Sequence, residues 1–178
     1  MKECKHNIIL SSVLSGRIAI NASRQCVKDK IIQLDTLNIT SSKFNIHIEK
    51  LSPNLYRPTK YGEILINTDI KKRNIDLSEC LKSFDGKITG LISGWIFAKI
   101  VIGSGGHQDN VFEEANNLCE WIIKFSDIND IYIILIDTDL KIKFDKLKEK
   151  YSNINNLIIG NHIQIQQYFI DTYSGCNK

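Results

Sequence analysis

The chain lacks the sequence features of several large protein classes. Its five cysteines are odd in number and form no C-x-x-C pair, which argues against a zinc site and against the disulfide framework of a secreted protein. No apolar run approaches the 18 residues needed to cross a bilayer, and the first residues do not have the pattern of a signal peptide. We therefore expect a cytoplasmic protein with no membrane association.

A strong charge of one sign is also absent. The net charge of +3 over 178 residues is too small to indicate nucleic-acid binding by itself. Residues 1–80 carry 13 basic and 8 acidic residues, whereas residues 81–178 carry 10 and 12. This asymmetry would suit a phosphate-binding front half joined to a metal-binding rear half, and ordinary scatter of surface charge is an equal alternative.

Hydrophobic patterning predicts an α/β fold with a mixed central β-sheet flanked by helices. Residues 61–178 form the predicted core, and residues 1–60, where 7–22 show mixed cues, form an N-terminal segment that could contact DNA. Strands are expected at 44–51, 63–70, 131–137 and 156–160, with a hairpin over 87–102 that turns at Ser93-Gly94. Helices are expected at 24–35, 109–125 and 144–151, a proline-containing loop at 51–63, and a helix or strand at 162–171.

Lys99 stands inside the apolar strand 95–102, WIFAKIVI. Strand alternation gives it one face with Trp95, Phe97 and Val101. A buried lysine is costly to keep charged unless it has an anionic partner or faces a wet cleft. The alternative is a structural lysine whose amine reaches solvent near the strand end.

Asp85 precedes the first hairpin strand, with thirteen residues between it and Lys99. The two side chains can therefore meet at one end of the hairpin. A carboxylate can bind a divalent metal ion, and a nearby lysine can orient a water molecule or neutralise charge on a phosphate. The alternative is that Asp85-Gly86 simply forms a turn.

Residues 84–139 resemble the catalytic core of type II restriction endonucleases of the PD-(D/E)xK superfamily. The resemblance depends on the order of six features: FDG, an apolar hairpin, Lys99, GSGG, a helix that carries a glutamine, and YIILIDTD. The resemblance implies that Asp85 is the first motif acid, that Lys99 is the motif lysine and that Gln108 lies beside the active site. Residues 131–137 would be the next core strand, leading to Asp137 and Asp139. The implied activity is Mg²⁺-dependent, site-specific cleavage of double-stranded DNA. An enzyme of this kind would act as a homodimer, and a companion DNA methyltransferase would act on the same site.

One position departs from the motif, because Phe97 stands where the second acid belongs, two residues before Lys99. A subgroup of these nucleases carries that acid on the following helix, about a dozen residues after the lysine. Glu113 has this spacing and would join Asp85 as a metal ligand, although the helical phase turns it away from the apolar face. Glu114, or no second acid at all, remains an alternative. Asp69 is an alternative first acid.

The remaining polar residues have simpler interpretations. The glycine turn at 103–106 has neither the P-loop lysine nor the dinucleotide-binding spacing, so we expect it to approach a DNA phosphate. His107 is expected to be a polar turn residue, and the basic runs 57–60 and 71–73 could contact phosphates or solvent. Two other functions stay open: a degenerate or truncated nuclease module that binds DNA without cutting it, and a small α/β assembly domain.

Overall fold

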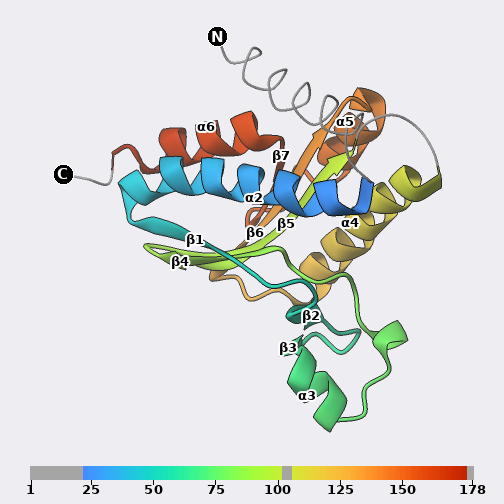
Figure 1. Ribbon diagram of the computed structural model, residues 1–178. Helices are drawn as coiled ribbons and strands as arrows, with labels where there is room; N and C mark the ends of the chain where they lie inside the picture. The colour runs from blue at the N-terminus through green and yellow to red at the C-terminus, as the bar shows by residue number, and fades with distance from the viewer. Residues whose placement is uncertain (1–21, 102–105, 176–178) are drawn as a thin grey trace.

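A five-stranded mixed sheet forms the centre of the protein (Figure 1). The computed structural model describes residues 22–101 and 106–175, with side chains for 31–101 and 110–175. The strand order is β1 (Ile46–Lys50), β4 (Gly86–Gly90), β5 (Ser93–Val101), β6 (Asp130–Thr138) and β7 (Leu157–Gly160). The first three strands are antiparallel, and β6 and β7 run parallel to β5. The predicted α/β fold with a mixed sheet is confirmed.

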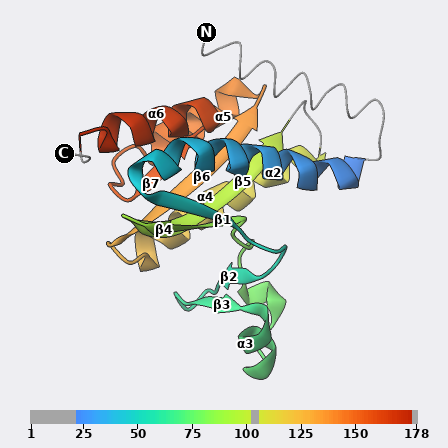
Figure 2. The same ribbon diagram turned by 60° about the vertical axis from the view of Figure 1, so that its left-hand side comes forward.

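Helices cover both faces of this sheet (Figures 1 and 2). Helices α2 (Ala22–Ser41) and α6 (His162–Tyr173) lie on one face, and α4 (Gly106–Phe125) and α5 (Lys141–Lys150) lie on the other. Strand β5 contributes to both layers because its side chains alternate. Ile96 and Ala98 belong to the core under α2 and α6, whereas Trp95, Phe97 and Val101 belong to the core under α4 and α5. The strand phase predicted for β5 is therefore confirmed.

The hairpin between β4 and β5 turns earlier than predicted. Gly90 has a φ of +104°, and a Cβ there would lie 2.2 Å from the carbonyl oxygen of Asn45. Ser93 and Gly94, the predicted turn, already belong to β5. A Cβ on Gly94 would lie 1.9 Å from the carbonyl oxygen of Ile131. Gly94 is therefore needed for the close approach of β5 to β6, which a turn signal in the sequence does not distinguish.

The N-terminal segment joins the same sheet and helix layers. Helix α2 is longer than the predicted 24–35, and the mixed cues at residues 7–22 fall almost wholly outside the described residues. Strand β1 alternates as predicted, with Ile46 and Ile48 buried and His47 and Glu49 exposed. It pairs with β4 along its whole length.

The chain between β1 and β4 forms an arm that projects from the sheet (Figures 1 and 2). It consists of β2 (Tyr56–Pro58), β3 (Ile64–Ile66), α3 (Asn67–Lys72) and the 3₁₀ helix η2 (Leu77–Glu79); another 3₁₀ turn, η1 (Ser42–Phe44), precedes β1. The prediction of a loop at 51–63 was wrong for β2, since Pro58 ends a strand of a two-stranded sheet, where proline is tolerated. The strand predicted at 63–70 is only three residues long and continues as α3.

The C-terminal half follows the predicted order. Helix α4 begins at Gly106, three residues before the predicted start, and ends at Phe125 as predicted. The last element is a helix, because Asn161 and Gln164 form a capping box at its start. None of the helices in the described part of the chain has the length and apolar content to span a bilayer.

Helix α4 is fixed to α5 by a polar cluster of four side chains. The Tyr151 hydroxyl donates to Oε1 of Glu120 at 2.6 Å, and its oxygen lies 2.7 Å from Oδ1 of Asn116. Nζ of Lys150 lies 2.8 Å from Oδ1 of Asn116 and 2.9 Å from Oε1 of Glu120. The hydrogen bond from Tyr151 lowers the pKa of Glu120, and the bond from Lys150 adds to this effect. The cluster holds the helix that carries Glu113 and Glu114.

Candidate active site

Asp85 is fixed directly against β5. Its backbone N–H donates to the carbonyl oxygen of Ile96 at 2.8 Å, and its Oδ2 accepts from the backbone N–H of Ala98 at 2.9 Å. Asp85 comes immediately before β4, which begins at Gly86. The two hydrogen bonds place its carboxylate beside the backbone of Ala98, the residue that precedes Lys99.

Lys99 has the anionic partner that its burial requires. Its side chain is 13% exposed, and its Nζ lies 3.8 Å from Oε2 of Glu114 on α4. The structure thus brings Lys99 together with an acid from the next helix, while the backbone hydrogen bonds of β5 bring Asp85 to the same part of the sheet. The sequence predicted that Lys99 would meet Asp85, and the ion pair that the structure gives Lys99 is with Glu114.

Phe97, in the position of the missing motif acid, packs below the lysine. Its ring is fully buried, and its centroid lies 4.8 Å from Nζ of Lys99. A cation held over an aromatic face is stabilised by the ring quadrupole. Phenylalanine cannot bind a metal ion, so this position supplies packing and a favourable environment for the ammonium group.

Glu114, rather than Glu113, reaches the lysine. Its carboxylate lies between two ammonium groups, with Oε1 3.1 Å from Nζ of Lys82 and Oε2 3.8 Å from Nζ of Lys99. Glu113 is exposed. This difference follows from the helical phase, because Ala115 and Leu118 face the sheet and Glu114 lies at the border of that face.

The donor set fits a hard divalent cation. No group of three or more His, Cys, Asp or Glu side chains that could hold a metal ion is found among the residues with described placement. Mg²⁺ does not need such a group, because it keeps several waters and binds through one or two carboxylates together with substrate phosphate oxygens. Asp85, hydrogen bonded to the backbone of Ala98, and Glu114, paired with Lys99, are the two carboxylates that could supply oxygen ligands, and oxygen ligands suit Mg²⁺ better than zinc.

Several predicted residues lie elsewhere or beyond the description. His107 and Gln108 lie in the first turn of α4, and their side chains are outside the described residues, as are Gly103 and Gly105. Asp69 lies on α3 in the projecting arm, with its Oδ1 3.8 Å from Nζ of Lys72. Of the two alternatives for the first acid, Asp85 is the one that is hydrogen bonded to β5.

The basic runs of the arm are engaged within it. The guanidinium of Arg57 donates to the carbonyl oxygen of Leu81 and to Oδ1 of Asn54. Arg73 forms an ion pair with Glu63 at 3.0 Å. The ion pairs of Arg73 and Lys72 partly neutralise residues 71–73, whereas the partners of Arg57 are uncharged.

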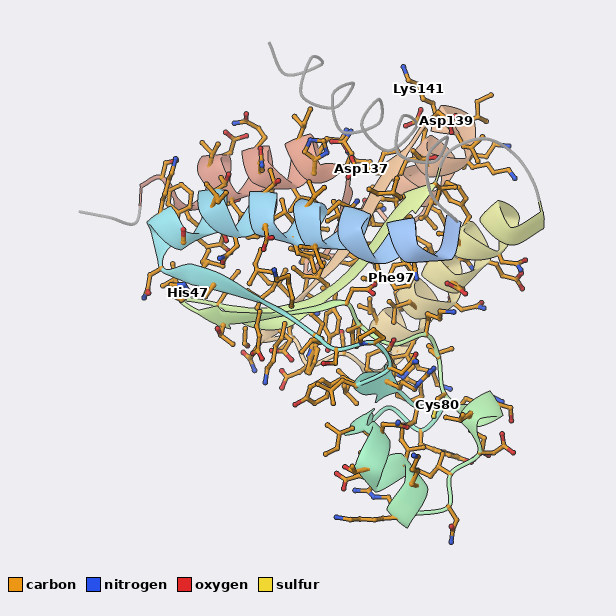
Figure 3. All side chains as sticks on the ribbon, viewed as in Figure 1. His47, Cys80, Phe97, Asp137, Asp139 and Lys141 are labelled. Carbon is orange, nitrogen blue, oxygen red and sulfur yellow. The ribbon has the colours of Figure 1, made fainter. Side chains whose placement is uncertain are left out.

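A second polar cluster, on the α2 and α6 face, was not predicted. Oδ2 of Asp137 accepts from Nε2 of Gln33 at 2.7 Å, and Oδ1 accepts from Nδ1 of His162 at 2.7 Å. Nε2 of Gln33 also donates to the carbonyl oxygen of Lys99 at 3.1 Å. All three side chains are fully buried, and Asp137 lies near the end of β6, with the exposed Asp139 just beyond it (Figure 3). Asp at the end of an apolar strand was the only signal for this cluster in the sequence.

Neither the tryptophans nor the two described thiols resemble reactive groups. Trp95 and Trp121 are core residues, and the indole of Trp121 donates to the carbonyl oxygen of Thr59 at 2.7 Å. Cys80 and Cys119 are free thiols. Burial raises the pKa of Cys119 to about 12, so it is not a thiolate nucleophile at neutral pH.

Comparison with known proteins gives no relative: no protein-family model, no curated protein and no solved structure matches the chain. The chemistry of the site is therefore argued from its own residues.

Proposed function

We propose that the protein is a Mg²⁺-dependent endonuclease that cuts double-stranded DNA at a specific site, as type II restriction endonucleases do. The observation that carries this proposal is the placement of Lys99. Its ammonium group lies 3.8 Å from the Glu114 carboxylate. The Asp85 carboxylate accepts a hydrogen bond from the backbone N–H of Ala98, the residue before Lys99. Carboxylates that can bind a divalent metal ion, with a lysine close to them, are the groups that metal-assisted phosphodiester hydrolysis uses.

Each residue has a distinct role in the proposed reaction. Asp85 and Glu114 would hold Mg²⁺, which polarises a phosphoryl oxygen and acidifies a bound water. Lys99 orients the attacking water and stabilises the negative charge that develops on the phosphate as the P–O bond to the leaving oxygen breaks. Gln108, at the start of α4, keeps its proposed role of orienting this assembly.

We propose Glu114 as the second metal ligand in place of Glu113. The helix turns Glu113 to solvent, whereas Glu114 faces Lys99 and Lys82. Of the two glutamates, Glu114 is the one whose carboxylate contacts Lys99.

The proposed reaction has consequences for partners. Cutting both strands of a symmetric site needs two active sites, so the protein would act as a homodimer. Hydrogen bonds to base edges in the major groove would select the site. A cytoplasmic nuclease of this kind would need a companion DNA methyltransferase that protects the same site in the host chromosome.

Cleavage of phage DNA tests the proposal and the choice of glutamate together. Wild-type protein with Mg²⁺ is expected to give discrete fragments. Glu114→Gln should reduce the cleavage rate on the order of 10²-fold or more, because a metal ligand is lost, and Glu113→Gln, the matched control on the same helix, should cut normally.

Three results would contradict this proposal in different ways. If Glu113→Gln abolishes cleavage and Glu114→Gln does not, the metal ligand is Glu113. If wild-type protein binds DNA in a salt-dependent manner but does not cut it, the chain is a degenerate nuclease module, as Phe97 in the motif position would then explain. If it has no affinity for DNA, a small α/β assembly domain is the better description.

A further inference from the structure

Lys82 is a second lysine at the site that the proposed reaction does not use. It lies in the linker between η2 and β4, three residues before Asp85. Its Nζ is 3.1 Å from Oε1 of Glu114, closer than the 3.8 Å between Lys99 and Oε2. The two ammonium groups thus approach different oxygens of one carboxylate.

The linker that carries Lys82 is firmly attached to the arm and to the sheet. The backbone N–H of Leu81 donates to the carbonyl oxygen of Pro58 at 2.8 Å, and that of Phe84 donates to the carbonyl oxygen of Tyr56 at 3.1 Å. The N–H of Asp85 donates to β5. Lys82 therefore starts from a fixed backbone position, and only its four-carbon side chain is free to change direction.

The two lysines differ in how easily they can leave Glu114. The Lys99 side chain is 13% exposed and stands on a central strand, whereas the Lys82 side chain is 46% exposed. An ion pair with a half-exposed lysine contributes little, because water and salt screen it. When a cation binds to Glu114, Lys82 is the group that can move into solvent or to another anion.

We infer that Lys82 is a positioning residue with two alternative partners: it holds the Glu114 carboxylate in the free protein, and it is displaced by the divalent cation and then contacts a DNA backbone phosphate. This inference rests on the proposed function. Lysine suits both partners, because its ammonium is a compact charge with three donors that binds carboxylate or phosphate.

Mn²⁺ binding in the absence of DNA tests the first half of the inference by titration calorimetry. Lys82→Met should bind Mn²⁺ about 1.5- to 5-fold more tightly than wild type, because the cation no longer displaces an ammonium group from Glu114. The matched control is Lys87→Met, which removes a positive charge from the same sheet face, where Lys87 lies over the rings of Tyr56 and Trp95. Its effect should be smaller than that of Lys82→Met.

Steady-state cleavage at saturating Mn²⁺ tests the second half. Loss of a phosphate contact made equally in the ground state and the transition state raises KM without lowering kcat. Lys82→Met should therefore raise KM severalfold and leave kcat within about twofold of wild type, and Lys82→Arg should restore KM.

The outcomes separate this inference from the proposed function. If wild type binds Mn²⁺ and cuts DNA, but Lys82→Met binds Mn²⁺ no more tightly than Lys87→Met or has an unchanged KM, the role assigned to Lys82 is wrong and the nuclease proposal stands. The proposed function fails if the wild type does not cut DNA and the Glu114→Gln variant binds Mn²⁺ as tightly as the wild type. The inference about Lys82 then fails as well.

Discussion

Lys99→Met is expected to lower the rate of DNA cleavage by on the order of 10²- to 10³-fold while the protein stays folded. The substitution removes the ammonium group and replaces one methylene with sulfur, and methionine fills nearly the same volume over Phe97. The partner carboxylate Glu114 keeps its contact with Lys82. Because a lysine that is 13% exposed is costly to keep charged, the thermal midpoint should be unchanged or higher.

The measurement is single-turnover cleavage beside a thermal melt and a DNA-binding assay. Lys87→Met is the matched control, because it removes the same group from a lysine on the same sheet face. A variant that cuts at the wild-type rate would remove Lys99 from the mechanism. A variant that loses activity because it is unfolded would show that Lys99 has a structural role, which is the alternative considered from the sequence.

Asp137→Ala is expected to destabilise the protein by about 3 kcal/mol, because each buried donor that loses its acceptor costs about 1–3 kcal/mol. The substitution removes the acceptor for the Gln33 amide and for the ring and backbone N–H groups of His162. Both side chains are fully buried, so water does not readily replace the lost acceptor. A loss of this size is a large part of the 5–15 kcal/mol that stabilises a typical domain.

Urea denaturation would measure this loss. Asp145→Ala, at an exposed position on α5, is the control and should change the free energy of unfolding by less than about 0.5 kcal/mol. If Asp137→Ala changes the free energy of unfolding by as little as the Asp145→Ala control does, the buried cluster makes no net contribution to stability.

The strongly patterned segments were predictable from sequence because one physical signal dominates each of them. Strand β6 is continuously apolar since it is buried on both faces, and α4 repeats apolar residues every three or four positions. The arm was not predictable, because β2 and β3 are three residues each and are held by backbone pairing that leaves no periodic pattern.

The site was predictable in part for the same reason. Strand alternation gave the face of Lys99, and hairpin geometry predicted that Asp85 would approach this strand, where its carboxylate accepts from the backbone N–H of Ala98. Helical phase showed that Glu113 points away from the core, but it did not show which glutamate reaches Lys99, since that depends on where α4 crosses the sheet. The cluster of Gln33, Asp137 and His162 was out of reach, because its hydrogen bonds join residues 25 to 104 positions apart.

The most direct test of a single divalent ion held by Asp85 and Glu114 beside Lys99 is the anomalous scattering of Mn²⁺ in crystals of the wild-type protein. The account predicts one strong peak between these two side chains, at about 2–2.3 Å from an oxygen of each carboxylate. A peak bound by other residues, or no peak at Mn²⁺ concentrations that support cleavage, would contradict it.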